Sequence, residues 1–329
     1  MGSAKPVVCI VTPGTRDANN GNWRTAARWA QMLGDRYRVI VQTAWDGKPA
    51  DAMIALHARR SAASIADFRK RATGRRLGVV LTGTDLYKDL PESAEAARSL
   101  DLADRIVVLQ DDALRILDAK WRGKCEVIFQ SAPTLARRRK ARNRLDCVMV
   151  GHLRAEKDPL TLFRAMERLP PDLPIRIRHI GAALDPRLGD AARALELRDS
   201  RYRFVGALPR GLTRASIAAA HILIHPSIVE GGANVIVEAV TGGTAVIASR
   251  ISGNVGMLGR DYPGYFEPGD ESGLAGRLVQ AVEDPGYRRA LALAAAARKP
   301  LFAPSAEARA IRRLAERLLA PGGRTQGRL

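Results

Sequence analysis

The residues best suited to binding or catalysis lie in the segment 225–243, where two glutamates flank a pair of glycines. Glu230 comes directly before Gly231 and Gly232, and Glu238 follows after the pair. A glycine pair at the entry to a helix leaves backbone N–H groups open, and such groups bind phosphate well. The apolar run after the glycines predicts a helix that is buried almost all round, with Glu238 as its only charge. The segment therefore predicts an anion site with a carboxylate close by.

The carboxylate of Glu238 needs partners, because burying an unpaired charge costs several kcal/mol. The two hydroxyls of a ribose would serve as hydrogen-bond donors to it. An arginine from a neighbouring element would serve as well, and the residues alone leave both interpretations open. Asn234 lies one turn before Glu238 on the same helix face, so it belongs to the same predicted site.

The elements that must position these residues resemble a parallel sheet covered by helices. Short apolar runs in the second half of the chain predict strands at 147–150, 175–180, 202–205, 222–225 and 245–248, with a helix at 159–169. Such strands between amphipathic helices are typical of parallel sheets with both faces covered. Ligands of open parallel sheets bind beyond the carboxyl ends of the strands, which is where the glycine pair lies.

The first half of the chain shows the same alternation. Strands are predicted at 7–12, 39–43, 53–56, 77–81, 106–109 and 127–129, and helices at 23–33, 61–71 and 113–120. The length of 329 residues also suits two domains. We therefore expect an α/β protein with two Rossmann-like domains, 1–140 and 146–304, whose parallel sheets face each other across a cleft. A helix at about 305–320 is expected to pack back on the first domain, and the tail 321–329 to be disordered.

The first domain holds a second group of polar residues beyond its strands. The loop after the first strand is rich in Gly and Asn and opens a helix with Asn22 as its predicted N-cap, so this helix start predicts a second anion site. A merely flexible loop is the alternative. The strand at 77–81 is followed by polar residues that we expect to point into the cleft. The predicted acceptor-binding residues are Arg16, Asn20, Gly21, Asn22, Arg24, Thr25, Thr82, Gly83, Thr84 and Asp85.

Three histidines also follow predicted strands. They are His57, His152 and His225, and each is placed where it could touch a donor or an acceptor. A lone histidine in such a position is more often a structural residue. Both interpretations stay open, and only His152 enters the predicted donor site.

The formal net charge of +19 invites comparison with nucleic-acid-binding proteins. Only nine of the 53 basic residues are lysine, and the arginines are spread along helix-like segments. Aromatic residues make up only 5% of the chain, which leaves few side chains to stack on bases. We expect no nucleic-acid partner. A positive field of this kind favours small anionic substrates such as phosphates.

Membrane, disulfide and metal-binding classes are also disfavoured. No apolar run reaches about 18 residues and the N-terminus lacks the features of a signal peptide, so we expect a cytoplasmic protein without stable membrane insertion. The cysteines, Cys9, Cys125 and Cys147, show no Cys-x-x-Cys spacing, which argues against disulfides and zinc. No Asp-x-Asp pair occurs, so no metal is predicted for a diphosphate.

The spacing of Glu230 and Glu238 around the glycine pair resembles the Glu-x7-Glu motif of retaining glycosyltransferases with two Rossmann-like domains, the GT4-like family of the GT-B fold. The segment 150–159 is similar to the Gly-Arg-Leu-x3-Lys-Gly motif of the same family. The resemblance implies that Glu230 contacts the donor sugar and that Glu238 binds the ribose. It also implies that Lys157 and the glycine turn hold the diphosphate.

The resemblance covers about residues 146–300 and includes departures from the family pattern. Position 152 carries histidine where the family has arginine, and Arg154 offers a second cation close by. Residues 252–255 resemble the loop near the donor, but Gly256 stands where the family has glutamate. The implied donor-binding residues are Gly151, His152, Arg154, Lys157, Glu230, Gly231, Gly232, Ala233, Asn234 and Glu238.

Four short segments resemble one branch of that family, the selenosugar synthases of selenoneine biosynthesis. They lie at 20–26, 81–87, 130–133 and 227–235. This resemblance implies transfer of glucose or N-acetylglucosamine from a UDP-sugar to selenophosphate, with formation of a carbon–selenium bond and then a 1-selenosugar. The implied catalytic residues are Lys157, Glu230, Asn22 and Arg24, with UDP-sugar and selenophosphate as co-substrates and no further cofactor.

Two other functions remain open at this point. A conventional transferase of the same family would use a lipid or glycan hydroxyl, and such an acceptor would need an exposed apolar or aromatic patch that the first domain does not clearly show. A non-catalytic nucleic-acid-binding protein is the third hypothesis. Paired glutamates beside a glycine turn argue against it, because they would repel phosphate. The sequence does not identify the donor sugar.

Overall fold

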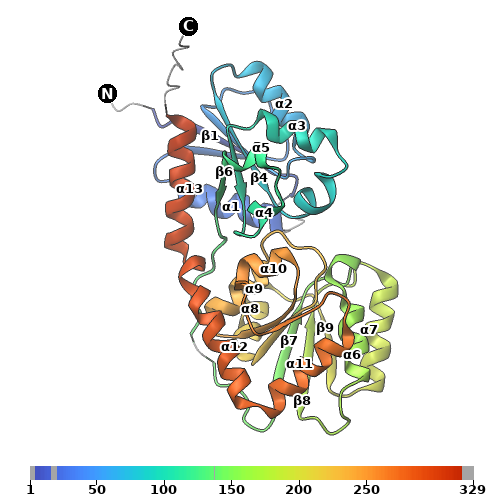
Figure 1. Cartoon of the computed structure of the whole chain (residues 1–329). Coiled ribbons are helices and arrows are strands. Elements are labelled where there is room, and N and C mark those ends of the chain that lie inside the picture. The colour runs from blue at the N-terminus through green and yellow to red at the C-terminus, as the bar shows by residue number, and fades with distance from the viewer. Residues whose placement is uncertain (1–3, 16–20, 137, 321–329) are drawn as a thin grey trace. The chain divides into compact units, whose positions relative to one another are not determined.

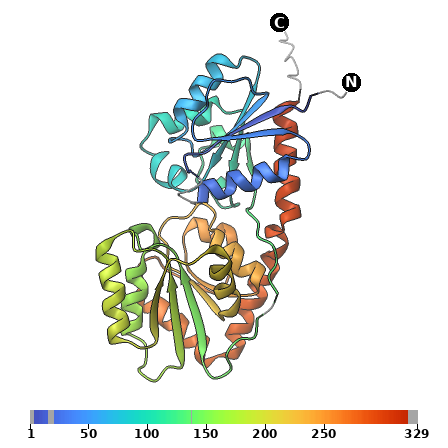
Figure 2. The ribbon, with the colours of Figure 1, turned by 180° about the vertical axis from the view of Figure 1, so that it is seen from behind.

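The computed structural model describes residues 4–15, 21–136 and 138–320 of the chain. The chain folds as two compact units, the first made of Met1–Gln130 with Ser305–Leu329 and the second of Ser131–Pro304. In each unit the described strands form a six-stranded parallel sheet with helices on both faces (Figure 1 and Figure 2). The predicted α/β fold class, with two parallel sheets, is confirmed.

The sheet of the first unit is built from short apolar runs. Its strands are β1 (Val7–Val11), β2 (Arg38–Gln42), β3 (Ala52–Leu56), β4 (Arg76–Leu81), β5 (Arg105–Val108) and β6 (Cys125–Val127), in the order β2-β1-β3-β4-β5-β6. Every residue of β3 is buried, as expected of a central strand covered on both faces. The strand order reverses between β1 and β3, so the loops after these two strands flank the usual ligand crevice of such a sheet.

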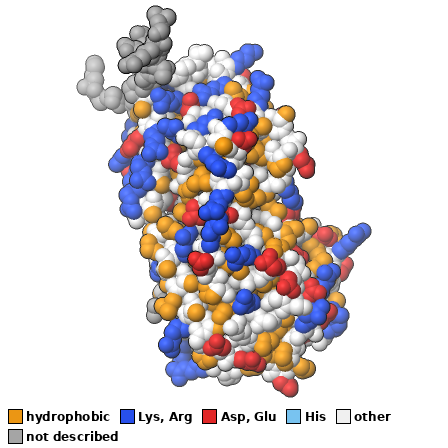
Figure 3. All heavy atoms as spheres, viewed as in Figure 1, with side chains coloured by type: hydrophobic (Ala, Val, Ile, Leu, Met, Phe, Trp, Pro, Cys, Tyr) orange, Lys and Arg blue, Asp and Glu red, His pale blue; other side chains and the backbone are white. Residues whose placement is uncertain are grey.

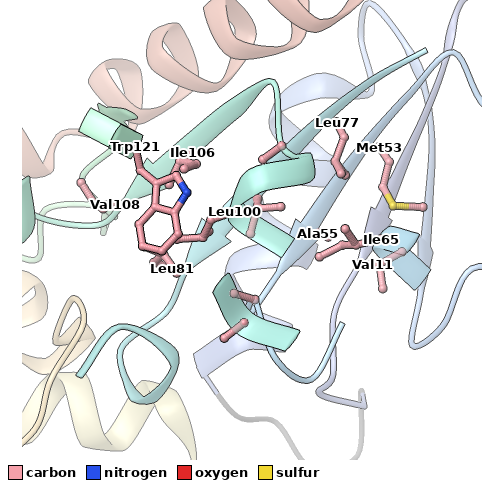
Figure 4. Packing of buried hydrophobic residues seen from close by; sticks show 14 of the residues in the cluster. Val11, Met53, Ala55, Ile65, Leu77, Leu81, Leu100, Ile106, Val108 and Trp121 are labelled. Atoms are coloured by element: carbon pink, nitrogen blue, oxygen red, sulfur yellow. The ribbon is translucent and has the colours of Figure 1, made fainter. Parts of the chain in front are cut away.

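The helices of the first unit cover two apolar cores. They are α1 (Gly21–Leu33), α2 (Ala62–Arg71), α3 (Ala94–Leu102), α4 (Ala113–Ile116), α5 (Ala119–Arg122) and α13 (Pro304–Leu319), with a π-helical turn η1 (Asp85–Asp89). Met53 and Ile54 are neighbours in β3 and point to opposite faces. Met53 packs in the same core as Leu100 of α3 and Trp121 of α5 (Figure 4), whereas Ile54 packs in the core of Trp29 of α1.

Helix α13 is joined to α1 through a buried carboxylate. Glu307 accepts hydrogen bonds from Arg28 Nε at 2.8 Å and from Trp29 Nε1 at 2.7 Å. The Glu307 side chain is fully buried, and its ion pair and hydrogen bonds offset the cost of burying a carboxylate. Helix α13 therefore fixes α1, whose first turn carries several of the predicted acceptor residues.

The second unit repeats the architecture with a different strand order. Its strands are β7 (Leu145–Val150), β8 (Ile175–Ile180), β9 (Tyr202–Gly206), β10 (Ile222–His225), β11 (Ala245–Ser249) and β12 (Tyr265–Phe266), in the order β12-β11-β10-β7-β8-β9. β7 has β8 on one side and β10 on the other, so the order reverses between β7 and β10. This position is where doubly wound sheets bind ligands, at the carboxyl ends of the two strands.

The helices of the second unit are more numerous than the sequence indicated. They are α6 (Pro159–Glu167), α7 (Pro186–Arg198), α8 (Arg210–Ala219), α9 (Asn234–Gly242), α10 (Ser252–Leu258), α11 (Glu271–Glu283) and α12 (Pro285–Arg298), with 3-10 turns η2 (Ala155–Lys157) and η3 (Lys299–Phe302). The predicted burial of the helix after the glycine pair is confirmed, since residues 236–242 of α9 are all buried.

Three local predictions were wrong. The expected helix at 113–120 is two short helices, because Leu117 is extended and Asp118 caps α5 by accepting from Lys120 N. The expected strand at 127–129 lies at Cys125–Val127. The segment 252–255, which resembled a loop, forms the first turn of α10. The tail 321–329, predicted to be disordered, lies outside the described residues.

Basic side chains do not gather in a single patch on the face shown in Figure 3. Lys and Arg side chains lie on both units there and alternate with Asp and Glu. Many of the arginines form ion pairs within their own unit, such as Arg28 with Glu307 and Arg201 with Asp199. Among the described residues, no helix is both long enough and apolar enough to cross a membrane.

Candidate functional site

The predicted donor residues come together at the carboxyl ends of β7 and β10. These strands are direct neighbours in register, with Cys147 opposite Ile222 and Met149 opposite Ile224. The loop 151–158 follows β7 and the loop 226–233 follows β10. A backbone hydrogen bond of 3.0 Å from Ile228 N to Glu156 O joins the two loops. Residues separated by about 75 positions in sequence therefore share one edge of the sheet.

Lys157, His225 and Glu230 form the charged centre of this edge. Lys157 Nζ donates a short hydrogen bond to Glu230 Oε1. His225 Nε2 lies 3.3 Å from the same carboxylate oxygen. The side chains of Lys157, Glu230 and His225 are only 16%, 11% and 2% exposed, so solvent screens their interactions weakly.

The protonation states at this centre follow from burial and charge. Burial alone would raise the pKa of Glu230, but the Lys157 ammonium and the His225 ring outweigh it and hold the pKa well below its usual range. Burial lowers the pKa of His225 in spite of the nearby carboxylate. Near neutral pH Glu230 is therefore a carboxylate and His225 a neutral imidazole.

The glycine turn leads into α9 without a side-chain cap. Helix α9 begins at Asn234, its N-cap position is the extended Ala233, and its first turn holds no acidic residue. The positive end of this helix dipole therefore faces the turn formed by Gly231 and Gly232. Helix α10 packs against the turn, because a Cβ atom on Gly253 would lie only 2.0 Å from Glu230 O. Backbone thus surrounds Glu230 closely on this side.

The partners of Glu238 are arginines of the neighbouring helix. Glu238 is buried on α9, and its Oε1 lies 3.6 Å from Arg210 Nε and 3.8 Å from Arg214 Nε. Both arginines belong to α8 and are four residues apart, so they lie on one helix face. From sequence, either ribose hydroxyls or an arginine could have been the partner of Glu238, and the structure shows arginines beside it. The Arg-x3-Arg spacing was the signal that could have identified them.

The other residues of the loop after β7 have structural partners. His152 is exposed, and its Nδ1 accepts a hydrogen bond of 2.9 Å from Ala182 N. Arg154 is half exposed, with Nε 4.0 Å from Glu156 Oε2. Asp158 adopts a left-handed backbone (φ 43°) at the position where the resembled motif has glycine, and aspartate is one of the few other residues that tolerate it. Gly151 lies beneath the aliphatic stem of Lys157, since a Cβ there would be 3.3 Å from Lys157 Cγ.

The predicted acceptor residues of the first unit are only partly accessible. Helix α1 begins at Gly21, so Asn22 lies inside the first turn and the prediction that it caps the helix was wrong. Thr25 is buried, donates to Gly21 O at 2.9 Å and accepts from Gln130 Nε2 at 2.6 Å. Arg24 is half-buried in the same turn. Arg16 and Asn20 lie outside the described residues.

Asp85 does not point outward from the sheet as we expected. Its carboxylate is fully buried and accepts backbone hydrogen bonds from Thr82 N and Gly83 N at 2.8 Å and from Ala58 N at 3.0 Å. Gly83 adopts φ 133°, which turns these N–H groups toward the carboxylate. Asp85 therefore shapes the turn after β4, while Thr82 and Thr84 stay half-buried at its surface.

His57, which the sequence left open, lies at the point where the strand order of the first unit reverses. It is buried after β3 with a left-handed backbone (φ 72°), a conformation that costs about 1–3 kcal/mol and clusters at functional sites. Its Nδ1 accepts from Arg60 N at 3.3 Å, and its Nε2 lies 3.1 Å from Thr84 Oγ1. Asp89 Oδ2 lies 3.8 Å from Nε2. Burial lowers the pKa of His57, so the ring is neutral near pH 7.

Other features of the second unit lie away from this edge. A depression of about 580 Å³ between α6 and α11, lined by Arg168, Gly276 and Glu283 among others, contains none of the predicted residues. The described residues include no group of three His, Cys, Asp or Glu side chains placed to hold a metal ion. The Lys157–Glu230 edge is therefore our candidate site in the second unit.

Known proteins share this fold over nearly the whole chain. Sucrose-phosphate synthase from Thermosynechococcus elongatus matches with a TM-score of 0.76 at 17% identity, covering 97% of this chain and 100% of that one. The Anabaena protein HepE, solved in complex with UDP and glucose, matches with a TM-score of 0.72 at 16% identity, covering 95% and 100%. At such identities the likeness shows the fold, which is the GT-B fold of two Rossmann-like domains.

Sequence comparison matches part of the chain. α-Maltose-1-phosphate synthase of Mycobacterium tuberculosis is 28% identical over 148 residues, which is 43% of this chain and 38% of that relative. The family model "Glycosyl transferases group 1" matches residues 134–299, just over half of the chain, and this range contains the Lys157–Glu230 edge and Glu238 with its arginines. The chain belongs to the group 1 family of glycosyl transferases.

Proposed function

We propose that the protein transfers a hexose, glucose or N-acetylglucosamine, from a UDP-sugar to selenophosphate without a metal ion. The observation that carries the donor half is the Lys157–Glu230 pair beside the uncapped start of α9, at the point where the strand order reverses. A lysine and open backbone N–H groups suit a diphosphate, and a buried carboxylate beside them suits sugar hydroxyls. HepE, solved with UDP and glucose, has the same fold, which supports a UDP-sugar as donor.

The donor would rearrange the charges of the site. In the structure the Lys157 ammonium is paired with Glu230, and a diphosphate brings more negative charge to the same ammonium. We expect Lys157 to turn toward the diphosphate and to stabilise the leaving UDP together with the dipole of α9. Glu230 is then released to accept from sugar hydroxyls. Glu238 stays beside Arg210 and Arg214 and accepts from the ribose hydroxyls.

The acceptor half rests on the likeness of the segments at 20–26, 81–87 and 130–133 to selenosugar synthases. Selenium of selenophosphate would attack the anomeric carbon while the bond from that carbon to the UDP oxygen breaks, and the bonding electron pair would leave with UDP. The acceptor is already an anion, so no proton has to be removed from it. The start of α1 with Asn22 and Arg24 is the proposed binding place for its phosphate group.

The test is a coupled assay of the whole protein with UDP-glucose or UDP-N-acetylglucosamine and selenophosphate. We expect release of UDP only when both substrates are present, and a selenium-containing sugar phosphate by mass spectrometry. Orthophosphate in place of selenophosphate is the matched control and should release no UDP. Absence of UDP release with selenophosphate, together with release in the presence of a sugar or lipid alcohol, would contradict the proposed acceptor.

A further inference from the structure

A buried pair of polar residues, Tyr202 and His179, lies directly behind the loop that carries Lys157. His179 is fully buried in β8, and its ring lies among the rings of Phe163, Tyr202 and Phe204. The centroids of these three rings lie 5.7 to 6.2 Å from the centroid of the His179 ring. A histidine in an aromatic pocket costs free energy unless both ring nitrogens find partners. Its retention there calls for an explanation beyond packing, since an apolar side chain would fill the same space.

Both nitrogens of His179 are hydrogen-bonded, and the partners fix its tautomer. Nε2 lies 3.3 Å from Gly151 O, and Nδ1 lies 2.8 Å from the Tyr202 hydroxyl. A carbonyl oxygen accepts only, so Nε2 carries the proton and Nδ1 accepts from Tyr202. Burial lowers the pKa of His179 to about 4, so this neutral tautomer persists throughout the physiological range. The pair therefore presents one hydrogen-bond donor, the Nε2–H group of His179, to the carbonyl oxygen of Gly151.

That carbonyl belongs to the first peptide of the loop after β7. The peptide is trans, so the N–H of His152 points opposite to the carbonyl of Gly151 and away from His179. The same carbonyl lies against Gly181, where a Cβ atom would approach it to 1.9 Å. The stem of Lys157 rests on Gly151. A single peptide therefore connects the Tyr202–His179 pair to the ammonium that contacts Glu230.

The sheet is locally adapted to place His179 there. Tyr202 pairs with Ile177 and Phe204 with His179, but the next pairing joins Ile180 to Gly206, so β9 contains an extra residue at this point. Such bulges re-aim side chains and are frequent beside active sites. The irregularity lies at the carboxyl end of β8, next to the loop that it supports.

We propose that Tyr202 and His179 are positioning residues for the donor-phosphate loop. The pair holds the Gly151 peptide so that the His152 N–H and the Lys157 ammonium both face the diphosphate, an assignment that rests on the proposed function. Neither residue touches the substrate. Their loss therefore weakens nucleotide binding through the loop and does not remove a reacting group.

The test compares UDP affinity by calorimetry and the melting temperature for three variants of the whole chain. His179→Phe fills the aromatic pocket without its hydrogen bonds, and Tyr202→Phe removes the hydroxyl alone. The matched control is His221→Phe, because His221 also has partners at both ring nitrogens but lies at the opposite end of the sheet. Its Nδ1 accepts from Asp146 N at 3.0 Å, and its Nε2 lies 3.1 Å from Ala141 O. A merely structural role would give His179→Phe and His221→Phe the same profile.

We expect His179→Phe to weaken UDP binding about tenfold and Tyr202→Phe about threefold, with His221→Phe within twofold of the wild type at a similar loss of melting temperature. Wild-type affinity in His179→Phe would overturn the positioning role, as would an equal loss in His221→Phe. If His179→Phe does not fold, wild-type affinity in Tyr202→Phe overturns it instead. A wild-type protein that binds neither UDP nor UDP-sugar would contradict the proposed function, which is a separate result.

Discussion

Arg214 of α8 holds its Nε 3.8 Å from Oε1 of Glu238 on α9, and the two side chains are only 14% and 7% exposed. Arg210, one turn earlier on α8, lies 3.6 Å from the same oxygen but is 49% exposed. The buried carboxylate therefore lies near one arginine inside the protein and another at its surface. Arg214 is the less exposed of these two arginines.

Replacing Glu238 should weaken the donor site. We expect Glu238→Ala to lower the affinity for UDP-sugar about tenfold or more, because the ribose hydroxyls lose their acceptor and two arginines lose their partner. Isothermal calorimetry with UDP-glucose measures this. Glu283→Ala removes an exposed carboxylate from α11 and serves as the control. Unchanged affinity in Glu238→Ala would rule out the ribose role.

The two arginines should differ in their effect on stability. Arg214→Ala should lower the free energy of unfolding by about 2 kcal/mol, because it leaves Glu238 buried and also removes the hydrogen bond from Arg214 Nη2 to Pro133 O. Arg210→Ala should cost less than about 1 kcal/mol, since solvent screens its exposed charge. Urea denaturation of both variants checks the order. A larger loss in Arg210→Ala would contradict the assignment of Arg214 as the principal partner.

Lys157 should matter for the rate more than for folding. Lys157→Ala should lower kcat/KM for the UDP-sugar by about a hundredfold, because the leaving diphosphate loses its cation. UDP release under saturating acceptor gives the rate. Arg187→Ala, which removes a charge from the exposed face of α7, should leave the rate unchanged. A Lys157→Ala enzyme of near wild-type rate would place the diphosphate elsewhere.

Asp85 should behave as a structural residue. In Asp85→Asn an NH2 group replaces one carboxylate oxygen, so either Ala58 N or the pair Thr82 N and Gly83 N loses its acceptor. The melting temperature should fall by an amount that corresponds to about 1–3 kcal/mol. Affinity for UDP should stay unchanged, because we propose that UDP binds to the second unit. Thermal melting and calorimetry on the same sample separate the two. If Asp85→Asn melts at the wild-type temperature but no longer turns over the acceptor, Asp85 has the acceptor role that we predicted from sequence.

The stability of the protein should fall on mild acidification, in part through His179. Its pKa is about 4 in the folded protein because of burial, and about 6.5 in the unfolded chain. Between these values the unfolded state binds a proton that the folded state excludes, so stability falls as the pH decreases from about 6.5 to about 4. Urea denaturation from pH 7 to 5 should show that the free energy of unfolding depends less on pH in His179→Phe than in the wild type. The difference in slope should correspond to at most about one proton. The same slope in both proteins would mean that the folded protein does not exclude the proton from His179.

The strands and the glycine turn could be predicted from sequence because their signals are local. The apolar runs at 175–180 and 222–225 match β8 and β10 residue for residue. Helices α7, α11 and α12 were missed, because Ala and Arg spread around all faces of a helix give no clear apolar period. The long helix α13 was found because its apolar residues gather on one face.

The contacts of the site were harder to predict because they depend on which helices pack together. Glu238 requires a partner on any view, but the packing of α8 on α9 selects the arginines. Asp85 was misjudged for another reason. Its role depends on the backbone of the turn after β4, where Gly83 turns the N–H groups inward, and no spacing of residue types encodes that. Lys157 was identified only through the motif that it shares with a family.

Helix α13 follows the whole second unit in the chain but completes the core of the first. Arg28 and Trp29 meet Glu307 only after the residues of the second unit have been synthesised. During synthesis this face of the first sheet is therefore covered by α1 without α13 until the second unit has emerged from the ribosome. The segment translated first can reach its final state only after the residues of the second unit have been made.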